Sequence, residues 1–229
     1  MTKHALIVGV GAGLSASLAR ALKREDYDIS LASRSEAKLA GVAREADAKT
    51  YLCDAAKIED VAKLFADLDA AGRTPEFVCY NASGRLRGPI AELDPKEVLS
   101  AITVSAFGGF LVGQQAAKRM IPEGSGAIFF TGASASMKGF AQSAPFAMGK
   151  FALRGLAQSM ARELQPKGIH VAHFNIDGGI RSAARPNPPD QPDRFLDPDA
   201  IAETYISVLK QHRSAWSFEV ELRPWLETF

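Results

Sequence analysis

The chain has 229 residues, of which 47% are hydrophobic and 23% charged, enough for one domain with a sizeable core. A net charge of +1 and the lack of any basic run longer than two residues exclude the charge pattern of a nucleic-acid-binding protein. No apolar run approaches the roughly 20 residues of a membrane-spanning helix, and no signal-peptide core precedes the first glycines. We therefore expect a cytoplasmic protein.

Seven short apolar runs alternate with segments of helical periodicity. The runs are 5–9, 27–33, 50–54, 77–81, 127–131, 169–174 and 218–222, and the helical segments between them are 14–25, 35–46, 57–72, 95–120 and 143–165. Asp94-Pro95 and Asp197-Pro198 each place a capping side chain before a first-turn proline, which indicates two further helix starts. The alternation predicts an α/β fold, a single-domain, doubly wound (Rossmann-type) sheet of seven parallel strands with helices on both faces.

A glycine-rich turn, GVGAGLS, follows the first strand at residues 9–15. Gly9, Gly11 and Gly13 let the backbone approach a pyrophosphate, which would face the N-terminus of a helix that begins near Leu14. Because the strand ends at Val8, we take Gly9 as the turn glycine and prefer the Gly9-x-x-x-Gly13 register. The position of this turn predicts a nucleotide site. The alternative is a tight turn without a ligand.

Ser33 and Arg34 follow the second strand, where an NAD site would present an acidic residue to the ribose hydroxyls. A hydroxyl and a guanidinium suit a 2′-phosphate, so the sequence favours NADP over NAD. The alternative is that Arg34 is a solvated residue at the start of the next helix.

A long irregular stretch with five prolines spans residues 178–198, after the sixth strand. Loops of this length inside a compact domain are usually functional lids or disordered, and ligands bind at this end of such sheets. We interpret the stretch as a substrate lid within a single domain of residues 1–229. A simple surface excursion is the alternative.

Three more features follow one another along the chain. They are Cys53-Asp54 after the third strand, Asn81-Ala82-Ser83-Gly84 after the fourth, and Lys150 after the fifth. Together with the glycine turn, they resemble the short-chain dehydrogenase/reductase family over nearly the whole chain. The resemblance implies that Asp54 contacts the adenine and that Asn81, Ala82 and Ser83 line the cofactor pocket.

The turn Asp177-Gly178-Gly179-Ile180 matches the family's Pro-Gly turn, with Asp177 in place of the proline. The resemblance implies that the backbone after Gly178, at Ile180, binds the nicotinamide carboxamide. Residues 85–89 and 180–196 are then expected to shape the substrate pocket.

The family's Tyr-x-x-x-Lys motif is only half present. In that family the lysine binds the nicotinamide ribose and lowers the pKa of the tyrosine, which passes a proton to or from the substrate. Lys150 matches the lysine, but the tyrosine position holds Phe146. Ser143 occupies the position that the enoyl reductase variant of the motif gives to its tyrosine, so that variant does not fit either.

The other two polar positions of the family's active site also differ. The family's serine falls on Ala133, with Ser134 and Ser136 adjacent, and its asparagine aligns best with Ser105. Ser134 is the candidate hydroxyl, because it is next in sequence to the position of the family's serine.

A phenylalanine side chain has no proton to donate. Without a positioned acid, the reduction of a carbonyl is slower by a factor on the order of 10² to 10⁴. Three outcomes are compatible with Phe146. In the first, the proton is relayed by Ser134, Ser143 or a water molecule bound to Lys150. In the second, the substrate is an imine or an activated double bond, whose reduction needs less help from an acid. In the third, the chain is an inactive NADP-binding sensor or partner-binding module. We favour an NADP-dependent oxidoreductase of a small carbonyl, imine or related substrate, with Lys150 and Ser134 as catalytic candidates.

The helical segment 143–165 is apolar on more than one side, with one stripe through Phe146 and Leu153 and a second set that includes Phe151 and Leu156. We expect one side to meet the sheet and the other a second subunit, and the resemblance implies a homodimer or homotetramer. Trp225, Leu226 and Phe229 form a second candidate interface patch, for which a frayed end is the alternative. Two cysteines and four scattered histidines give neither a disulfide nor metal-ligand spacing.

Overall fold

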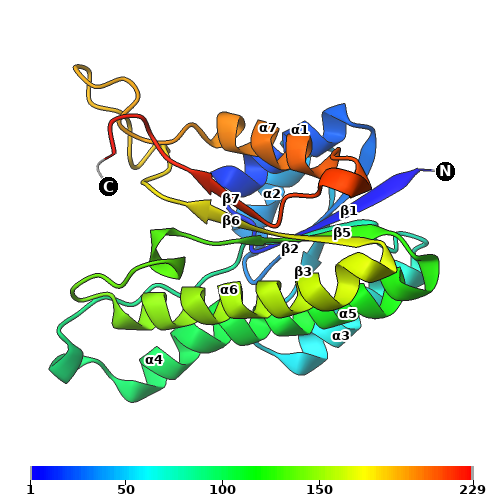
Figure 1. Ribbon diagram of the computed structural model, residues 1–229, viewed down its shortest axis with the longest axis horizontal. Coiled ribbons are helices and arrows are strands. Elements are labelled where there is room, and N and C mark those ends of the chain that lie inside the picture. Colours follow the sequence, from blue (N-terminus) through cyan, green and yellow to red (C-terminus); the bar gives the residue numbers. More distant parts are fainter. Residues whose placement is uncertain (1, 228–229) are drawn as a thin grey trace.

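A single parallel sheet organises residues 2–227, the part of the chain that the computed structural model describes (Figure 1). Its seven strands lie in the order β3-β2-β1-β4-β5-β6-β7, and every neighbouring pair is parallel. The doubly wound seven-stranded sheet predicted from the sequence is confirmed. The strands are β1 (Lys3–Val8), β2 (Tyr27–Ser33), β3 (Lys49–Leu52), β4 (Phe77–Tyr80), β5 (Gly126–Thr131), β6 (Ile169–Ile176) and β7 (Glu219–Leu222).

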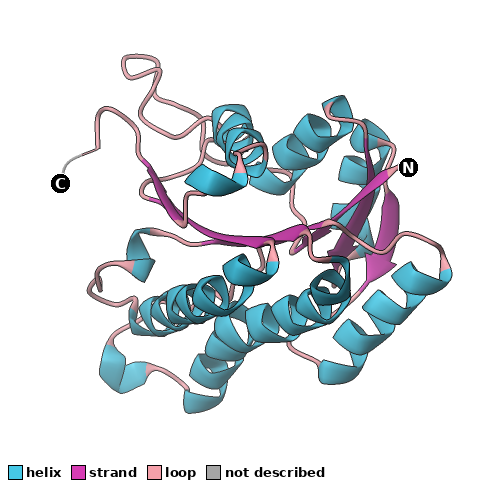
Figure 2. Ribbon diagram, turned by 45° about the vertical axis from the view of Figure 1, so that its right-hand side comes forward, coloured by secondary structure: helices cyan, strands magenta, loops and turns pink. Residues whose placement is uncertain are grey.

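Helices cover both faces of the sheet (Figures 1 and 2). On one face lie α1 (Leu14–Arg24), α2 (Glu36–Ala46) and α7 (Pro198–Leu209), and on the other lie α3 (Ile58–Ala70), α4 (Pro95–Ile102), α5 (Gly108–Glu123) and α6 (Ala144–Leu164). The helix expected over residues 95–120 is two α-helices joined by a π-helical turn, Thr103–Phe107, which turns Val104 and Ser105 into the interior. Periodicity alone does not reveal such a turn, because it adds one residue without breaking the helical path.

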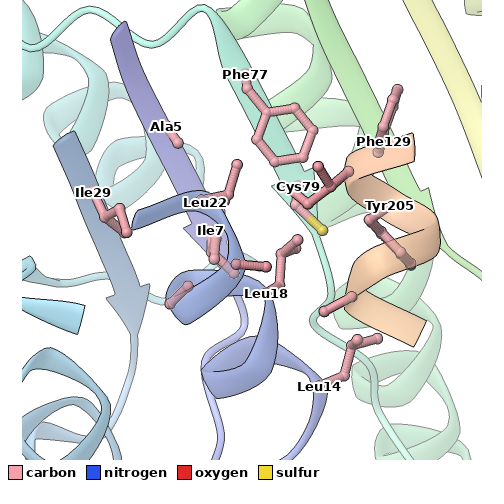
Figure 3. Packing of buried hydrophobic residues seen from close by; sticks show 14 of the residues in the cluster. Ala5, Ile7, Leu14, Leu18, Leu22, Ile29, Phe77, Cys79, Phe129 and Tyr205 are labelled. Carbon is pink, nitrogen blue, oxygen red and sulfur yellow. The ribbon is translucent and has the colours of Figure 1, made fainter. Parts of the chain in front are cut away.

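The apolar runs of the sequence are continuous because most strands are buried on both faces. In β4, Phe77 and Cys79 point to the cluster under α1 and α7, whereas Val78 and Tyr80 point to the cluster under α5 and α6. Figure 3 shows the first cluster, where Tyr205 of α7 packs over the sheet beside Phe129 and Cys79. The two cysteines are buried and free.

The two helix starts signalled by Asp-Pro pairs are confirmed. The Asp94 side chain accepts a hydrogen bond from the N–H of Lys96 at 2.8 Å, and the Asp197 side chain accepts one from the N–H of Asp199 at 2.9 Å. Each cap satisfies a backbone donor that the first helical turn leaves free.

One stretch, Pro95–Glu123, is long and apolar enough to cross a membrane by length and composition, contrary to the expectation that no segment would be. It consists of α4, the π-helical turn and α5. The stretch lies under the sheet, where α5 contacts β4 and β5 and both helices contact α6. That packing accounts for part of its apolar composition, whereas other large apolar side chains of the stretch, among them Phe107 and Phe110, are exposed.

Gly9 lies in the turn between β1 and α1, at a position that has no room for a side chain. Its φ of +91° lies in a region that L side chains rarely adopt, and an added Cβ would come within 2.2 Å of the Ala82 nitrogen. The close approach is reinforced by a hydrogen bond from the Asn81 N–H to the Val8 carbonyl at 2.8 Å. The first turn and the segment after β4 are therefore packed directly on each other.

We expect Gly9→Ala to lower the free energy of unfolding by about 2 kcal/mol or more, because the methyl group overlaps Ala82 and the backbone is strained. This corresponds to a fall in Tm of about 4 to 8 °C, measured by calorimetry. Gly41→Ala is the control, because a Cβ there meets nothing within 4 Å and Gly41 lies within α2, where alanine is preferred. An unchanged Tm in Gly9→Ala would show that the contact with Ala82 is not tight.

Candidate active site

A cavity of about 750 Å³, here called the glycine-turn cavity, lies at the carboxyl ends of β1 to β4. The strand order reverses between β1 and β4, which is the point where open α/β sheets bind ligands. Eleven of the residues assigned to the cofactor from the sequence line this cavity: Gly9, Gly11, Gly13, Leu14, Ser33, Arg34, Asp54, Asn81, Ala82, Ser83 and Ile180.

The glycine turn leaves open space where a pyrophosphate would lie. A Cβ added at Gly11 or Gly13 would meet nothing within 4 Å, and Gly13 caps α1 without a side-chain hydrogen bond. The free N–H groups at the start of α1 therefore face the cavity, which suits an anion. Asn81 holds the turn in place, because its amide donates to the Ser15 hydroxyl at 2.7 Å, and that hydroxyl donates to the Gly9 carbonyl at 3.1 Å. These residues fit a dinucleotide cofactor.

Two cations line the far end of the glycine-turn cavity. Arg34 follows β2, and Lys38 lies one helical turn further, in the first turn of α2. Within residues 2–227, neither side chain has a hydrogen-bond or ion-pair partner. Lys38 was missed from the sequence, although its spacing of four residues from Arg34 places the two on one side of the helix start. Asp54, opposite them, accepts a hydrogen bond from the Ala56 N–H at 3.1 Å.

A second cavity of about 270 Å³, here called the lysine cavity, adjoins the first and shares Asn81, Ser83 and Ile180 with it. Lys150 and Gly178, the two remaining residues assigned to the cofactor, line the lysine cavity. The two cavities together place all the assigned cofactor residues along one continuous path across the sheet edge.

Lys150 is buried in α6, with 3% of its surface exposed, and its Nζ donates a hydrogen bond to the Thr131 carbonyl at 2.7 Å. Burial, aided by the positive charge of Arg85, lowers the pKa of Lys150 to about 7. Phe146 lies one turn earlier, and the centroid of its ring is 5.9 Å from the Lys150 Nζ. An aromatic ring without a hydroxyl therefore lies beside the lysine.

The structure does not bring Ser134 together with Lys150. Ser134 does not line the lysine cavity; its side chain hydrogen-bonds Asp177, which also pairs with Arg223. Burial by itself would raise the pKa of Asp177, but the bonds from Ser134 and Arg223 outweigh it and lower the pKa. The aspartate that replaces the family's proline therefore draws the candidate hydroxyl out of the site.

The other hydroxyls considered from the sequence are also held elsewhere. The Ser136 hydroxyl accepts from the Ala133 N–H at 3.2 Å, and the Ser105 hydroxyl accepts from the Gly84 N–H at 2.9 Å. Ser143 is buried at the start of α6, outside the lining of the lysine cavity. Thr131 does line it, but its hydroxyl is hydrogen-bonded to Tyr205 at 2.9 Å.

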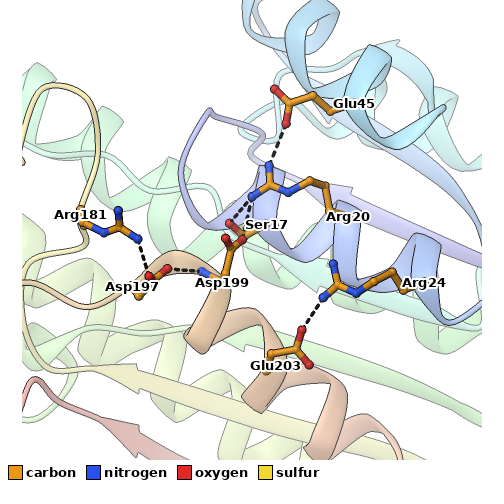
Figure 4. Close-up of polar contacts among 8 residues, drawn as sticks. All are labelled: Ser17, Arg20, Arg24, Glu45, Arg181, Asp197, Asp199 and Glu203. Atoms are coloured by element: carbon orange, nitrogen blue, oxygen red, sulfur yellow. Dashed lines mark hydrogen bonds and ion pairs between the residues drawn. The ribbon is translucent and has the colours of Figure 1, made fainter.

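The segment after β6 passes both cavities and is fastened at its ends. The N–H of Arg181 donates to the Leu196 carbonyl at 2.8 Å, and the N–H of Leu196 donates to the Gly179 carbonyl at 2.8 Å. Figure 4 shows the Arg181 side chain paired with Asp197 at the start of α7. The same view shows Arg20 of α1 bridging α2 and α7 through Glu45 and Asp199. No group of three or more His, Cys, Asp or Glu within residues 2–227 is placed to hold a metal ion.

Comparison with known proteins agrees with this arrangement. The family model for short chain dehydrogenase matches residues 3–187. An uncharacterized oxidoreductase of Staphylococcus aureus (strain N315) is 26% identical over 97% of each chain. The crystal structure of a short-chain dehydrogenase from Rhodopseudomonas palustris is 32% identical with a TM-score of 0.85, over 98% of this chain and 100% of that one. A metagenomic short-chain oxidoreductase in complex with NADP, 24% identical with a TM-score of 0.84 over 99% and 98%, has the same fold. The chain therefore belongs to the short-chain dehydrogenase family of oxidoreductases.

Proposed function

We propose that the protein is a cytoplasmic, NADP-dependent oxidoreductase that acts on a small carbonyl, imine or related substrate, with Lys150 as the proton donor. The observation that carries this proposal is the buried Lys150 ammonium in the lysine cavity, beside Phe146 and away from the serines considered as relays. When bound, the nicotinamide dinucleotide supplies the hydride.

Arg34 and Lys38 support NADP as the cofactor. Both are unpaired within residues 2–227 and line the end of the glycine-turn cavity opposite Asp54. A 2′-phosphate would satisfy both charges, whereas the ribose hydroxyls of NAD would leave two cations facing each other. Binding of NADP by the metagenomic relative agrees with this choice.

Lys150 can supply the proton that Phe146 cannot. Hydride addition to a carbonyl leaves an alkoxide, and a positioned acid with a pKa near the working pH is the most effective donor. A pKa of about 7 places Lys150 in that range, whereas an ordinary lysine would hold its proton too tightly. Ser134 is not part of this proposal, because Asp177 binds its side chain.

We expect Arg34→Ala to raise the Kd for NADPH about 10- to 100-fold, the loss of one charge-assisted contact, and to leave the Kd for NADH nearly unchanged. Fluorescence titration of both cofactors measures the difference. Arg44→Ala is the matched control, since Arg44 is exposed on α2, the helix that follows Arg34, and lies outside the cavity lining. Equal effects on NADPH and NADH would argue against a 2′-phosphate site.

Carbonyl reduction at saturating NADPH should be fastest at low pH and fall tenfold per pH unit above the pKa of Lys150. The sign follows because reduction consumes the proton of the ammonium form, which disappears as pH rises through a pKa of about 7 or higher, since the cofactor's phosphates favour the charged form. Lys150→Arg keeps the positive charge but holds its proton, so we expect a loss of about 10² to 10⁴ in kcat. Stopped-flow measurement of NADPH oxidation from pH 5 to 9 tests both.

Phe146→Tyr is the comparison for that experiment, because it restores the family's phenol beside Lys150 without changing the ring position. If the wild-type protein binds NADPH and reduces no carbonyl or imine, while Phe146→Tyr does, the native chain is a cofactor-binding module and Lys150 is not a sufficient acid.

A homo-oligomer built on the sheet face that carries α4 to α6 is part of the proposal. The second apolar set of α6 is exposed at Phe151, and Phe107 stacks on Phe110 at a centroid distance of 6.0 Å on the outer side of the neighbouring helix. The C-terminal patch is less continuous: Trp225 is exposed, Leu226 is partly buried, and Phe229 lies outside the described residues. The large exposed apolar side chains of this face are Leu99, Phe107, Phe110, Ile121, Met148 and Phe151.

Light scattering at micromolar concentration should give at least twice the chain mass of 24.5 kDa. Introducing charges with Phe110→Glu and Phe151→Glu should yield a monomer, because two buried carboxylates would face the partner. Trp225→Glu should leave the mass unchanged. A monomeric wild-type protein would refute this interface.

A further inference from the structure

The lysine cavity carries three cations and no carboxylate. Arg85 enters it from the loop after β4, Arg185 from the segment after β6, and Lys150 from α6. Its other lining residues are neutral: Asn81, Ser83, Thr131, Gly132, Ala133, Phe146, Ile176, Gly178 and Ile180. An uncompensated cluster of this kind beside the proton donor points to an anionic group on the ligand.

Arg85 and Arg185 differ from most arginines of this chain, because neither guanidinium group has a hydrogen bond or ion pair within residues 2–227. Seven other arginines are paired with carboxylates, as Arg181 is with Asp197. The carboxylate-paired arginines are Arg20, Arg24, Arg73, Arg119, Arg154, Arg181 and Arg223. The two guanidinium groups at the lysine cavity thus keep their donors free.

Each of these guanidinium groups lies over an aromatic ring. The Arg85 guanidinium carbon is 4.8 Å from the centroid of Phe146, and that of Arg185 is 5.8 Å from the centroid of Phe195. Stacking occupies a face of the guanidinium and leaves the N–H groups on its edge available for a planar anion. Phe146 therefore has a second role here, since its ring supports Arg85.

Backbone contacts fix both arginines on the cavity wall. Arg185 exchanges two backbone hydrogen bonds with Ser182, at 3.1 and 3.0 Å. Gly84, which precedes Arg85, donates to the Ser105 hydroxyl and packs so closely that an added Cβ would lie 2.5 Å from Ala101. Little ordering of the chain is then needed when a ligand binds.

The cofactor's phosphates do not account for these two cations. The pyrophosphate and 2′-phosphate positions lie in the glycine-turn cavity, whose lining includes Arg34, Lys38 and Arg181 but neither Arg85 nor Arg185. Loss of hydration, followed by the charges of Arg185 and Arg87, lowers the pKa of Arg85, so the positive charges near it repel one another.

We propose that the substrate is a small carbonyl compound with a carboxylate group, which Arg85 and Arg185 bind while its carbonyl lies at Lys150. This inference rests on the proposed function and names the substrate class. The carboxylate does not react: hydride from NADPH adds to the carbonyl carbon, Lys150 gives its proton to the carbonyl oxygen, and the products are a hydroxy acid and NADP⁺. A cavity of about 270 Å³ is at the small end of ligand sites, which fits a short oxo acid.

The test compares acids with their neutral methyl esters, using 4-oxopentanoate and acetoacetate with NADPH. We expect kcat/KM for each acid to exceed that for its ester about 10- to 100-fold at low salt, the range of charge-assisted contacts. Arg85→Gln and Arg185→Gln should bring the ratio close to one, mainly through KM. Arg87→Gln is the control, because Arg87 is an exposed residue of the same loop that does not line the cavity, and it should keep the ratio.

Calorimetric titration of 4-oxopentanoate into protein saturated with NADP⁺ gives a readout without turnover, because the oxidised cofactor cannot reduce a ketone. We expect binding that weakens at least about tenfold in Arg85→Gln and weakens with added salt. Equal binding of acid and ester, or binding that neither arginine affects, would overturn the carboxylate site. A preference for glyceraldehyde 3-phosphate over every oxo acid would overturn the carboxylate in favour of a phosphate.

The two proposals fail in different ways. If the acid binds through Arg85 and Arg185 but no carbonyl compound is reduced, the assigned activity is wrong and the anion site stands. If neutral carbonyls are reduced as well as acids in all variants, the activity stands and the carboxylate site is overturned.

Discussion

The burial of the Lys150 ammonium is the constraint on which the site depends. A charge in so apolar a setting is costly unless hydrogen-bond acceptors surround it, and the Lys150 Nζ donates a hydrogen bond to the Thr131 carbonyl. The carbonyl lies at the last residue of β5, so the lysine is fixed to the rigid centre of the sheet rather than to a loop. The same burial that makes the charged form expensive makes its proton easier to give away.

Asp177 accounts for the position of the Ser134 side chain outside the lysine cavity. It stands at the end of β6, where its N–H donates to the Leu222 carbonyl at 2.8 Å, and its carboxylate binds Ser134 and Arg223. A proline at this position could make neither the backbone bond nor the side-chain contacts. Asp177 therefore couples the turn after β5 to the C-terminal segment.

The sequence predicted the sheet, the helix caps and the glycine turn after β1 because these depend on local signals. Strand runs, the Asp-Pro caps and the register of Gly9 each need only a few neighbouring residues. It did not predict the π-helical turn at Thr103–Phe107, the partner of Ser134 or the role of Lys38. Those depend on side chains brought together from distant segments, as Ser134 and Arg223 are by the sheet. The apolar stretch Pro95–Glu123 was misjudged for a related reason, since its composition reflects the sheet above it.

Positively charged groups lie in both cavities, and their positions determine how anionic ligands can be oriented there. The glycine-turn cavity holds Arg34, Lys38 and the free N–H groups of α1, and the lysine cavity holds Arg85 and Arg185. The neutral residues Asn81 and Ser83, which both cavities share, lie between these two sets of anion-binding groups. A dinucleotide with phosphates at one end and a neutral amide at the other can satisfy the first set but not the second. Under our proposal, the second set binds the carboxylate of the substrate. That molecule would be drawn toward the side of the cavity where Lys150 holds its proton, because attraction between opposite charges is strongest in a partly dehydrated cleft. Burial is the main cause of the lowered pKa of Lys150, and Arg85, one of the two arginines in the proposed carboxylate site, lowers it further.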